Sequence, residues 1–353
     1  MKKGILSLLF VCAIILTGCG GEQSSSSISE GSTDSADSKK QVDKPIEWNL
    51  VSFVGLQHPM GAFLAEFAED LTERTDGRLS VTALPPGELP YAVSEYLRVT
   101  GEGSVEISDS FLPFHSGDLS IAAISDLPLL ITSFDEAKVA IDEVMMPYIE
   151  EELKDHGTKL LFWYPWPEQN IWGKGDPVTE ISDLANLKLR TQSPEQSSFL
   201  VELNANPVAL DSPEIPSAVS TGVIDGVITA SLNIMGSQWH EFTDWGFFIN
   251  FLIPPSYIVV NEEAYESLPE DIQGIVDAVS AEYQEKLGAH ISQIENDYKE
   301  QLINEHEIEI IDATDEQMNE LLSRFSPYWD EWASKQEPHV QEVLQKVRDV
   351  LSK

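Results

Sequence analysis

The feature that most constrains the fold is a long helical pattern in the last third of the chain. From Pro269 to about His306 there is no further proline, and apolar residues recur every three or four positions: Ile272, Ile275, Val276, Val279, Tyr283, Leu287, Ile291, Ile294 and Tyr298. At 1.5 Å per residue such a helix is ~55 Å long. Because that length exceeds one small lobe, we expect the helix to brace two.

Short apolar strands alternate with helical segments in the rest of the chain. We expect strands at residues 46–53, 79–84, 105–110, 158–164, 187–191, 207–210 and 223–229, and helices at 59–75, 91–100 and 133–152. This alternation is typical of α/β lobes with mostly parallel sheets. The folded part begins near Pro45, and its roughly 310 residues exceed a typical single core. We therefore expect two lobes.

The N-terminal residues have the organisation of a secretory signal. Lys2 and Lys3 precede an uncharged apolar run at 4–16, which is too short to span ~30 Å of hydrocarbon. Residues 16–19 then resemble the bacterial lipobox, whose cysteine takes a lipid; the alternative is an ordinary signal peptide with a chance cysteine. We expect a signal peptide at 1–18 and a flexible tether at 19–44 that is lipidated on Cys19. The mature protein would be extracytoplasmic and anchored to the cell membrane.

The composition excludes several kinds of site. Cys12 leaves with the signal and Cys19 carries the lipid, so we expect neither a disulfide nor a cysteine-based metal cluster. The formal net charge of −39 argues against binding nucleic acid through a basic patch. The hydrophobic content of 42% is enough for a packed core. No metal and no cofactor are expected.

Five segments in order resemble one family of bacterial binding proteins. They are residues 63–77, 181–190, 203–208, 221–226 and 261–273. Together with the signal sequence and the long helix, they resemble the solute-binding proteins of tripartite ATP-independent periplasmic (TRAP) transporters, the DctP type. The chain departs from this family at Asn186, where glycine is usual. It also departs at residues 227–229, where an acidic or amide residue is common.

The resemblance implies a two-lobed α/β fold of the periplasmic-binding-protein kind, with a ligand cleft between the lobes and the long helix spanning both. We expect residues 45–167 and 257–295 to form the first lobe, and residues 168–256 and 296–353 to form the second. The protein would close on a small organic acid and deliver it to a membrane permease. Its partners would be that ligand, the TRAP permease subunits and the membrane, and we expect a monomer.

Arg190 is the first candidate for binding the ligand. It ends the strand Leu187-Lys188-Leu189-Arg190, and strand ends that face a crevice are where open α/β sheets bind ligands. Arginine presents a planar fork that fits a carboxylate with two hydrogen bonds. From composition alone a surface salt bridge is the commoner role for an arginine. The family resemblance implies ligand binding instead.

Further candidates follow the predicted strands. His58 and its neighbour Gln57 lie in the loop after the first strand, where the resemblance implies a polar ligand contact, although a loop histidine is often merely exposed. Gln169 follows the strand at 158–164, where relatives often place a second polar or cationic contact; a solvated amide is the alternative. Ser212 and Thr229 are possible hydrogen-bond donors near the later strands.

Aromatic residues are dense between residues 162 and 172. They are Phe162, Trp163, Tyr164, Trp166 and Trp172. Buried strands favour aromatic residues, so these rings could belong to the core. Pro165 and Pro167 break the strand early, however, which favours placing some of these rings in the loop between the lobes. Trp166 is the candidate among them for contact with the ligand. An apolar wall there would suit an aromatic, branched or oxo-acid better than a small diacid.

The sequence contains no enzyme signature of the common hydrolase, metalloprotease, phosphate-loop or dinucleotide-binding kinds. A secreted acidic glycosidase needs two carboxylates at a defined separation in a cleft, and nothing selects two among 60 acidic residues. A ligand sensor for a membrane signalling kinase is a closer alternative, because the same fold could serve it. We therefore expect a binding protein and no enzyme.

Overall fold

The computed structural model describes residues 44–353. The predicted signal peptide at 1–18, Cys19 and nearly all of the predicted tether lie outside the described residues. Within the described part, every helix is too short or too polar to cross a membrane.

The first sheet has the strand order β2-β1-β3-β10-β4. Its strands are β1 (Ile46–Val51), β2 (Leu79–Leu84), β3 (Ile107–Phe111), β4 (Thr158–Pro165) and β10 (Pro255–Asn261). The second sheet has the order β11-β9-β5-β8-β6-β7. Its strands are β5 (Asn170–Gly173), β6 (Lys188–Thr191), β7 (Asn206–Ala209), β8 (Gly226–Thr229), β9 (Trp245–Phe248) and β11 (Glu309–Asp312).

Both sheets are mostly parallel, as expected, but each contains one reversed strand, β10 in the first sheet and β5 in the second. β10 runs antiparallel to β3 and β4, and β5 runs antiparallel to β8 and β9. The other pairs are parallel. The reason lies in the connections: β4 leads directly into β5 and β9 leads directly into β10. Each of these short connections carries the chain from one sheet to the other without the crossover helix that joins parallel strands.

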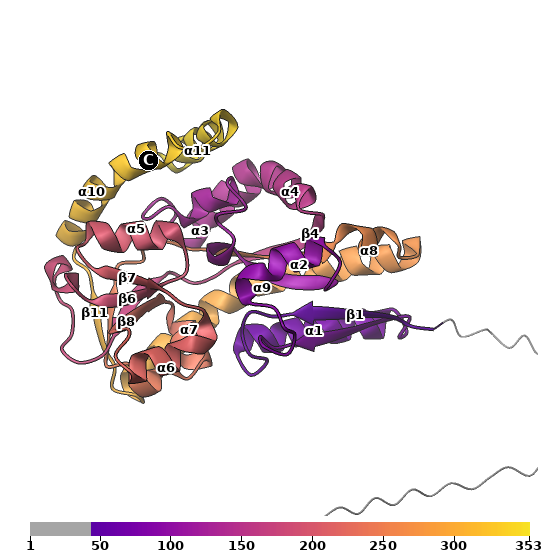
Figure 1. Ribbon diagram of the computed structural model, residues 1–353, viewed down its shortest axis with the longest axis horizontal. Coiled ribbons are helices and arrows are strands. Elements are labelled where there is room, and N and C mark those ends of the chain that lie inside the picture. The colour runs from indigo at the N-terminus through magenta and orange to yellow at the C-terminus, as the bar shows by residue number, and fades with distance from the viewer. Residues whose placement is uncertain (1–43) are drawn as a thin grey trace, which may run out of the picture. The chain divides into compact units, whose positions relative to one another are not determined.

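The helices surround the sheets (Figure 1). They are α1 (Pro59–Arg74), α2 (Tyr96–Gly101), α3 (Phe134–Lys138), α4 (Met146–Asp155), α5 (Pro194–Glu202), α6 (Ile215–Ser220), α7 (Ser231–Gly236), α8 (Glu262–Glu266), α9 (Glu270–Asn304), α10 (Asp315–Ala333) and α11 (Pro338–Leu351). The helix predicted at 133–152 is interrupted by a π-helical turn, η4 (Val139–Met145). Its N-terminal cap is confirmed, since Ser133 Oγ accepts the amide hydrogen of Glu136 at 3.2 Å.

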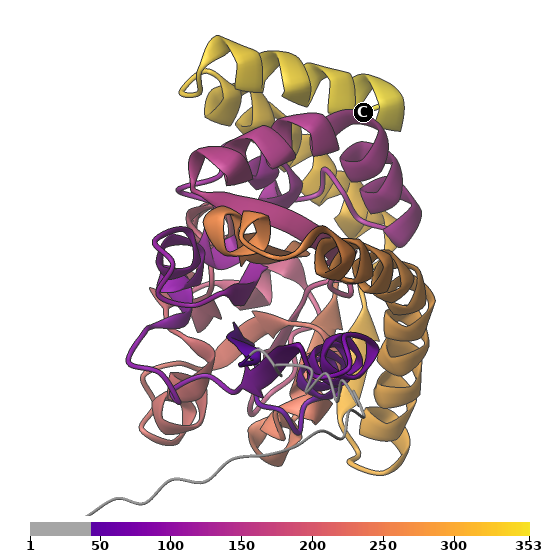
Figure 2. The same ribbon diagram turned by 90° about the vertical axis from the view of Figure 1, so that its right-hand side faces the viewer.

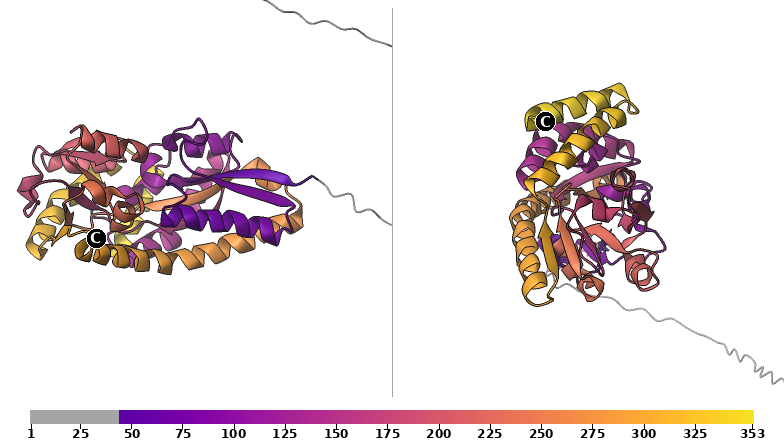
Figure 3. Two further views of the ribbon diagram at one scale, coloured as in Figure 1. Left: turned by 90° about the horizontal axis from the view of Figure 1, so that it is seen from below. Right: turned by 90° about the vertical axis from the view of Figure 1, so that its left-hand side faces the viewer.

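The long helix α9 is continuous and spans both sheets, as expected. It packs against β4 and α1 of the first sheet and against α7 beside the second. Figure 2 shows it passing along one side of the molecule, and Figure 3 (left) shows it running below α1 and on toward the second sheet. Six residues of the predicted apolar series are buried: Ile272, Val276, Val279, Tyr283, Leu287 and Ile291. The other three, Ile275, Ile294 and Tyr298, are partly buried.

The C-terminal helices α10 and α11 cover elements from both halves of the fold. The helix α11 packs against η4, and Trp329 of α10 donates its indole hydrogen to the Pro128 carbonyl oxygen at 2.8 Å. Phe325 of α10 also packs on Phe199 of α5, beside the second sheet, with ring centroids 4.6 Å apart. The chain passes from the first sheet to the second between residues 165 and 170, and back to the first sheet between residues 248 and 255. The lobe bounds at 45–167 with 257–295 and at 168–256 with 296–353 stay a prediction.

Candidate functional site

Arg190 lies on β6, inside the second sheet between β8 and β7. Its side chain is fully buried. Nε donates to the Leu210 carbonyl oxygen at 2.8 Å, and Nη2 donates to Ser212 Oγ at 3.3 Å. The third group, Nη1, is buried and has no hydrogen-bond partner among the described residues. The guanidinium is therefore held in place by neutral oxygens, with one nitrogen left over.

Burial lowers the pKa of Arg190 to about 9, while Asp211 and Glu214 act in the opposite direction. A pKa of about 9 still leaves the guanidinium positive near neutral pH. Burying a charge is costly unless it is paired, and none of the ion pairs within the described part involves Arg190. An anion placed against Nη1 would supply the missing pair.

His58 caps the N-terminus of α1 from inside the protein. Its side chain is 2% exposed, and Nδ1 accepts the amide hydrogen of Met60 at 3.2 Å. Burial lowers the pKa of His58 to about 3, so the ring is neutral. Because Nδ1 is an acceptor in a neutral ring, the hydrogen resides on Nε2. This Nε2 is buried and has no partner among the described residues, which makes it an available donor.

Trp166 packs at the centre of an aromatic cluster formed by Phe53, Phe111, Phe114 and Trp166. Its ring centroid lies 5.1 Å from that of Phe53 and 5.4 Å from that of Phe111. The His58 ring lies 5.7 Å away, and Arg190 Cζ lies 6.0 Å from the Phe114 centroid. The indole Nε1 of Trp166 is buried without a partner among the described residues. The cluster thus connects His58 to Arg190.

Two cavities adjoin these residues. The first, of about 340 Å³, is lined by residues that include Phe53, Gln57, His58, Ser212 and Trp239. The second, of about 320 Å³, is lined by residues that include Phe114, Thr191, Leu210, Asp211 and Glu214. Arg190 donates hydrogen bonds to Ser212, which lines the first cavity, and to the carbonyl oxygen of Leu210, which lines the second. The guanidinium therefore lies between the two cavities.

The structure brings five of the predicted site residues together: Arg190, Ser212, His58, Trp166 and Gln57. Gln57 lines the first cavity, although its side chain is exposed. Thr229 is buried at the end of β8, where its hydroxyl oxygen accepts from Asn233 at 3.0 Å. Gln169 is buried and its amide donates to the Pro167 carbonyl oxygen at 2.8 Å. Neither Thr229 nor Gln169 lines the two cavities, so their ligand contact stays a prediction.

Gln169 instead belongs to a junction between the sheets. Its amide hydrogen bonds to the Leu252 carbonyl oxygen at 2.9 Å, and its carbonyl oxygen accepts from Phe251 at 3.2 Å. The amide of Trp166 donates to the Pro254 carbonyl oxygen at 2.8 Å. The two short connections between the sheets are therefore hydrogen-bonded to each other beside the aromatic cluster.

Sequence reasoning missed several residues of the cluster. Phe53 lies two residues after β1, Phe111 is the last residue of β3, and Phe114 follows it in Phe111-Leu112-Pro113-Phe114. The signal that could have identified these rings is their position: apolar residues that lie at or just after the end of a strand, where the chain turns at the edge of a sheet. The departure at Asn186 has a simple cause: its φ is 69°, a left-handed conformation that glycine and asparagine tolerate.

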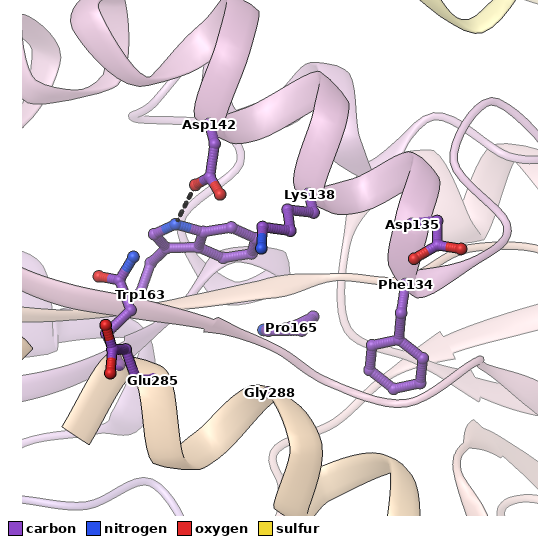
Figure 4. Close-up of a pocket in the computed structure, with 9 residues that line it drawn as sticks. Phe134, Asp135, Lys138, Asp142, Trp163, Pro165, Glu285 and Gly288 are labelled. Atoms are coloured by element: carbon purple, nitrogen blue, oxygen red, sulfur yellow. Dashed lines mark hydrogen bonds between the residues drawn. The ribbon is translucent and has the colours of Figure 1, made fainter. Parts of the chain in front are cut away.

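A third cavity, of about 420 Å³, lies against η4 and α9 (Figure 4). Its lining includes Asp135, Lys138, Asp142, Trp163 and Glu285. The Trp163 indole hydrogen is already donated to Asp142 at 2.8 Å, and the lining holds three carboxylates against one cation, Lys138. An organic anion would be repelled there, so this cavity is a poor candidate for the site.

A family model of the bacterial extracellular solute-binding proteins, family 7, matches residues 50–336. The C4-dicarboxylate-binding periplasmic protein DctP of Vibrio cholerae is 24% identical over 285 residues, covering 78% of this chain and 82% of that protein. A solute-binding protein of Albidiferax ferrireducens is 23% identical over 226 residues, covering 61% of this chain and 64% of that protein.

Solved structures show the same fold. DctP7, an extracytoplasmic solute receptor of Bordetella pertussis that binds pyroglutamic acid, superposes with a TM-score of 0.80 and is 22% identical, covering 86% of this chain and 99% of that chain. A TRAP periplasmic solute-binding protein of Sulfurospirillum deleyianum with bound succinate gives 0.79 at 18% identity, covering 86% and 99%. These structures confirm the two-lobed fold.

Proposed function

Because the chain belongs to family 7 of the bacterial extracellular solute-binding proteins, the DctP family of TRAP receptors, we propose that it captures a small organic acid on Arg190 and delivers it to a TRAP permease. The observation that carries this proposal is the buried Arg190 guanidinium, whose Nη1 has no partner among the described residues. A carboxylate would receive a charge-assisted hydrogen bond there.

The related receptors support an acid as the ligand class. Those compared above bind pyroglutamic acid or succinate, and the Vibrio cholerae protein is named for C4-dicarboxylates. The family consists of receptors, so we infer that this chain binds its ligand without converting it. The lipid on Cys19 and the monomeric state are part of the same proposal. Release of a Cys19→Ala protein from salt-washed membranes, with ligand binding unchanged, would support the anchor.

The experiment is calorimetry with a panel of mono- and dicarboxylic acids of three to six carbons. Arg190→Ala should weaken binding of the preferred acid by roughly a hundredfold or more, since breaking a buried charge pair costs ~3–5 kcal/mol. Arg190→Lys keeps the charge but loses the fork, so it should recover only part of the affinity.

Arg78→Ala is the matched control, because Arg78 is half-exposed and pairs with Asp271 at 2.7 Å on the surface. It removes the same charge and should leave the affinity unchanged. Binding by Arg190→Ala within about threefold of the parent would place the anion site elsewhere.

A further inference from the structure

Three buried polar atoms around the aromatic cluster are hydrogen-bond donors without a partner, and the one unpartnered acceptor in the lining of the two cavities is Gln192 Oε1 in the second, among the described residues. Arg190 Nη1, Trp166 Nε1 and His58 Nε2 are each buried without a partner within the described part of the chain. The indole nitrogen can only donate, and the His58 bond to Met60 makes Nε2 a donor as well. A ligand that satisfies all three must present acceptors to each of them.

Only one of the three donors carries a charge. Arg190 is a cation, whereas the indole is neutral and burial keeps His58 neutral. The linings of the two cavities contain no lysine and no arginine among the described residues. The charged groups that do line the second cavity are Asp211 and Glu214. A second carboxylate on the ligand would thus meet neutral donors on one side and acidic groups on the other.

The remaining wall of the site is flat and apolar. Phe53 and Phe111 stack with centroids 4.7 Å apart and an interplanar angle of 15°, and Phe114 meets Phe53 edge-on at 6.3 Å. These rings separate the Arg190 end from the His58 end. Hydrocarbon of the ligand would lie against them, because apolar surface gains from leaving water.

We propose that this site selects a monocarboxylate that carries an uncharged hydrogen-bond acceptor, such as an oxo or ring carbonyl group, and discriminates against dicarboxylates. The carboxylate pairs with Arg190, and the neutral acceptor takes hydrogen bonds from Trp166 Nε1 and His58 Nε2. A second carboxylate would be desolvated without a counter-charge, which is costly in a buried site. This inference rests on the proposed function, because it assumes that Arg190 anchors an acid.

Matched acids test the inference directly. Levulinate (4-oxopentanoate) and succinate share one carboxylate and the same two-carbon spacer, but levulinate ends in a methyl ketone where succinate has a second carboxylate. Pentanoate has the length of levulinate without the oxygen. Pairs of the same design at other chain lengths, such as 5-oxohexanoate with glutarate, allow for the unknown length of the natural ligand. In calorimetry, the oxo-acid of the best-binding length should bind at least tenfold more tightly than either of its matched acids.

Trp166→Phe separates a donor role from a packing role, because it removes the N–H and retains an aromatic ring. It should lower the affinity for the oxo-acid about tenfold and leave the affinity for the unsubstituted acid nearly unchanged. Trp163→Phe is the control, since the Trp163 N–H is already bonded to Asp142. It should change neither affinity.

The outcomes distinguish this inference from the proposed function. If a dicarboxylate binds as tightly as its matched oxo-acid, or if Trp166→Phe weakens both monocarboxylates equally, the inference is wrong and the carboxylate receptor stands. If no acid of the panel binds, or if Arg190→Ala binds as well as the parent, the proposed function is wrong as well.

Discussion

Gly236 determines how closely α7 can approach the His58 ring. A Cβ atom at this position would lie 2.3 Å from His58 Cδ2 and 2.6 Å from Nε2. The ring has little freedom to retreat, because it is bonded to the Met60 amide and packs on Trp166. We expect Gly236→Ala to displace the imidazole and to weaken ligand binding roughly tenfold, as measured by calorimetry.

Gly274→Ala is the control for this change. Gly274 also lies in a helix, but nothing lies within 4 Å of the Cβ that it would gain. It should leave binding unchanged and raise the free energy of unfolding by up to ~1 kcal/mol, the helix propensity difference between glycine and alanine. Unchanged ligand affinity in a folded Gly236→Ala protein would contradict the assigned role of His58.

Asp109 makes stability depend on pH. It accepts hydrogen bonds from Tyr164 at 2.9 Å and from Ser256, yet burial raises its pKa from the ordinary 3.8 to about 7. The folded state therefore binds this proton more tightly than the unfolded chain does. The free energy of unfolding should fall as pH rises from about 4 to about 7, by up to ~4 kcal/mol at ~1.4 kcal/mol per pKa unit.

Urea denaturation at pH 5 and pH 8 measures this loss. Asp109→Asn removes the titration, so the variant should lose less stability than the parent between these two pH values, whatever its stability at pH 5. Some loss should remain, because burial also raises the pKa of Glu295 to about 7. Equal losses in parent and variant would show that Asp109 does not titrate in this window.

Individual site residues were predictable only where a motif surrounds them. Arg190 was identified because it ends a strand within a segment that resembles a known family; in the structure it is buried and bonds to Ser212 and Leu210, which line the two cavities, and its contact with a ligand stays a prediction. The rings of Phe53, Phe111 and Phe114 come from separate parts of the first sheet. A single sequence does not indicate that these three rings come together, because each phenylalanine by itself is equally consistent with an ordinary core residue.

At the scale of elements, the strands with a clear alternation of apolar and polar residues or with a longer apolar run were predictable. The strands β5, β9 and β10, beside the two short connections between the sheets, were not. β1 and β2 were expected within a few residues of their observed bounds. β5 and β9 have only four residues each, and every residue of β5, β9 and β10 is buried. None of these three strands therefore shows the alternation of apolar and polar residues that marks a half-buried strand. Two of these strands, β5 and β10, run against the others in their sheets and create the antiparallel pairings that the sequence did not predict.

The helices α9 and α7 are joined by one buried side chain. Glu295 of α9 accepts the amide hydrogens of Ser231 at 3.0 Å and Leu232 at 2.7 Å, at the first turn of α7. The α7 N-cap residue, Ala230, provides no side-chain bond of its own. Glu295→Ala should therefore lower the free energy of unfolding by ~1–3 kcal/mol, the cost of leaving buried donors unsatisfied.

Thermal and urea unfolding would measure this change at pH 8. Glu300→Ala is the matched control, because Glu300 is exposed on the same helix. It should shift the free energy of unfolding by no more than ~0.5 kcal/mol. Similar effects of the two substitutions would mean that Glu295 does not cap α7.

At the scale of the whole molecule, the walls of the first cavity come from both sheets. Phe53 and His58 follow β1 of the first sheet, whereas Ser212 follows β7 of the second. The sheets are linked by the paired connections at Trp166–Gln169 and Phe251–Pro254, by the long helix α9 and by the C-terminal helices α10 and α11. The two short connections are suited to hinge closure, in which a few residues absorb the motion.

We therefore expect ligand to favour a closed form of the molecule. In small-angle scattering, saturating oxo-acid should reduce the radius of gyration of the parent, and tryptophan fluorescence should change if the proposed contact between Trp166 and the ligand forms. Arg190→Ala should show neither change at the same ligand concentration, because the anion that joins Arg190 to the His58 side is no longer held. Trp166→Phe with its reduced affinity should still close when saturated, but with a smaller fluorescence change. Scattering curves of the parent that coincide with and without bound ligand would contradict closure, even if calorimetry confirms binding.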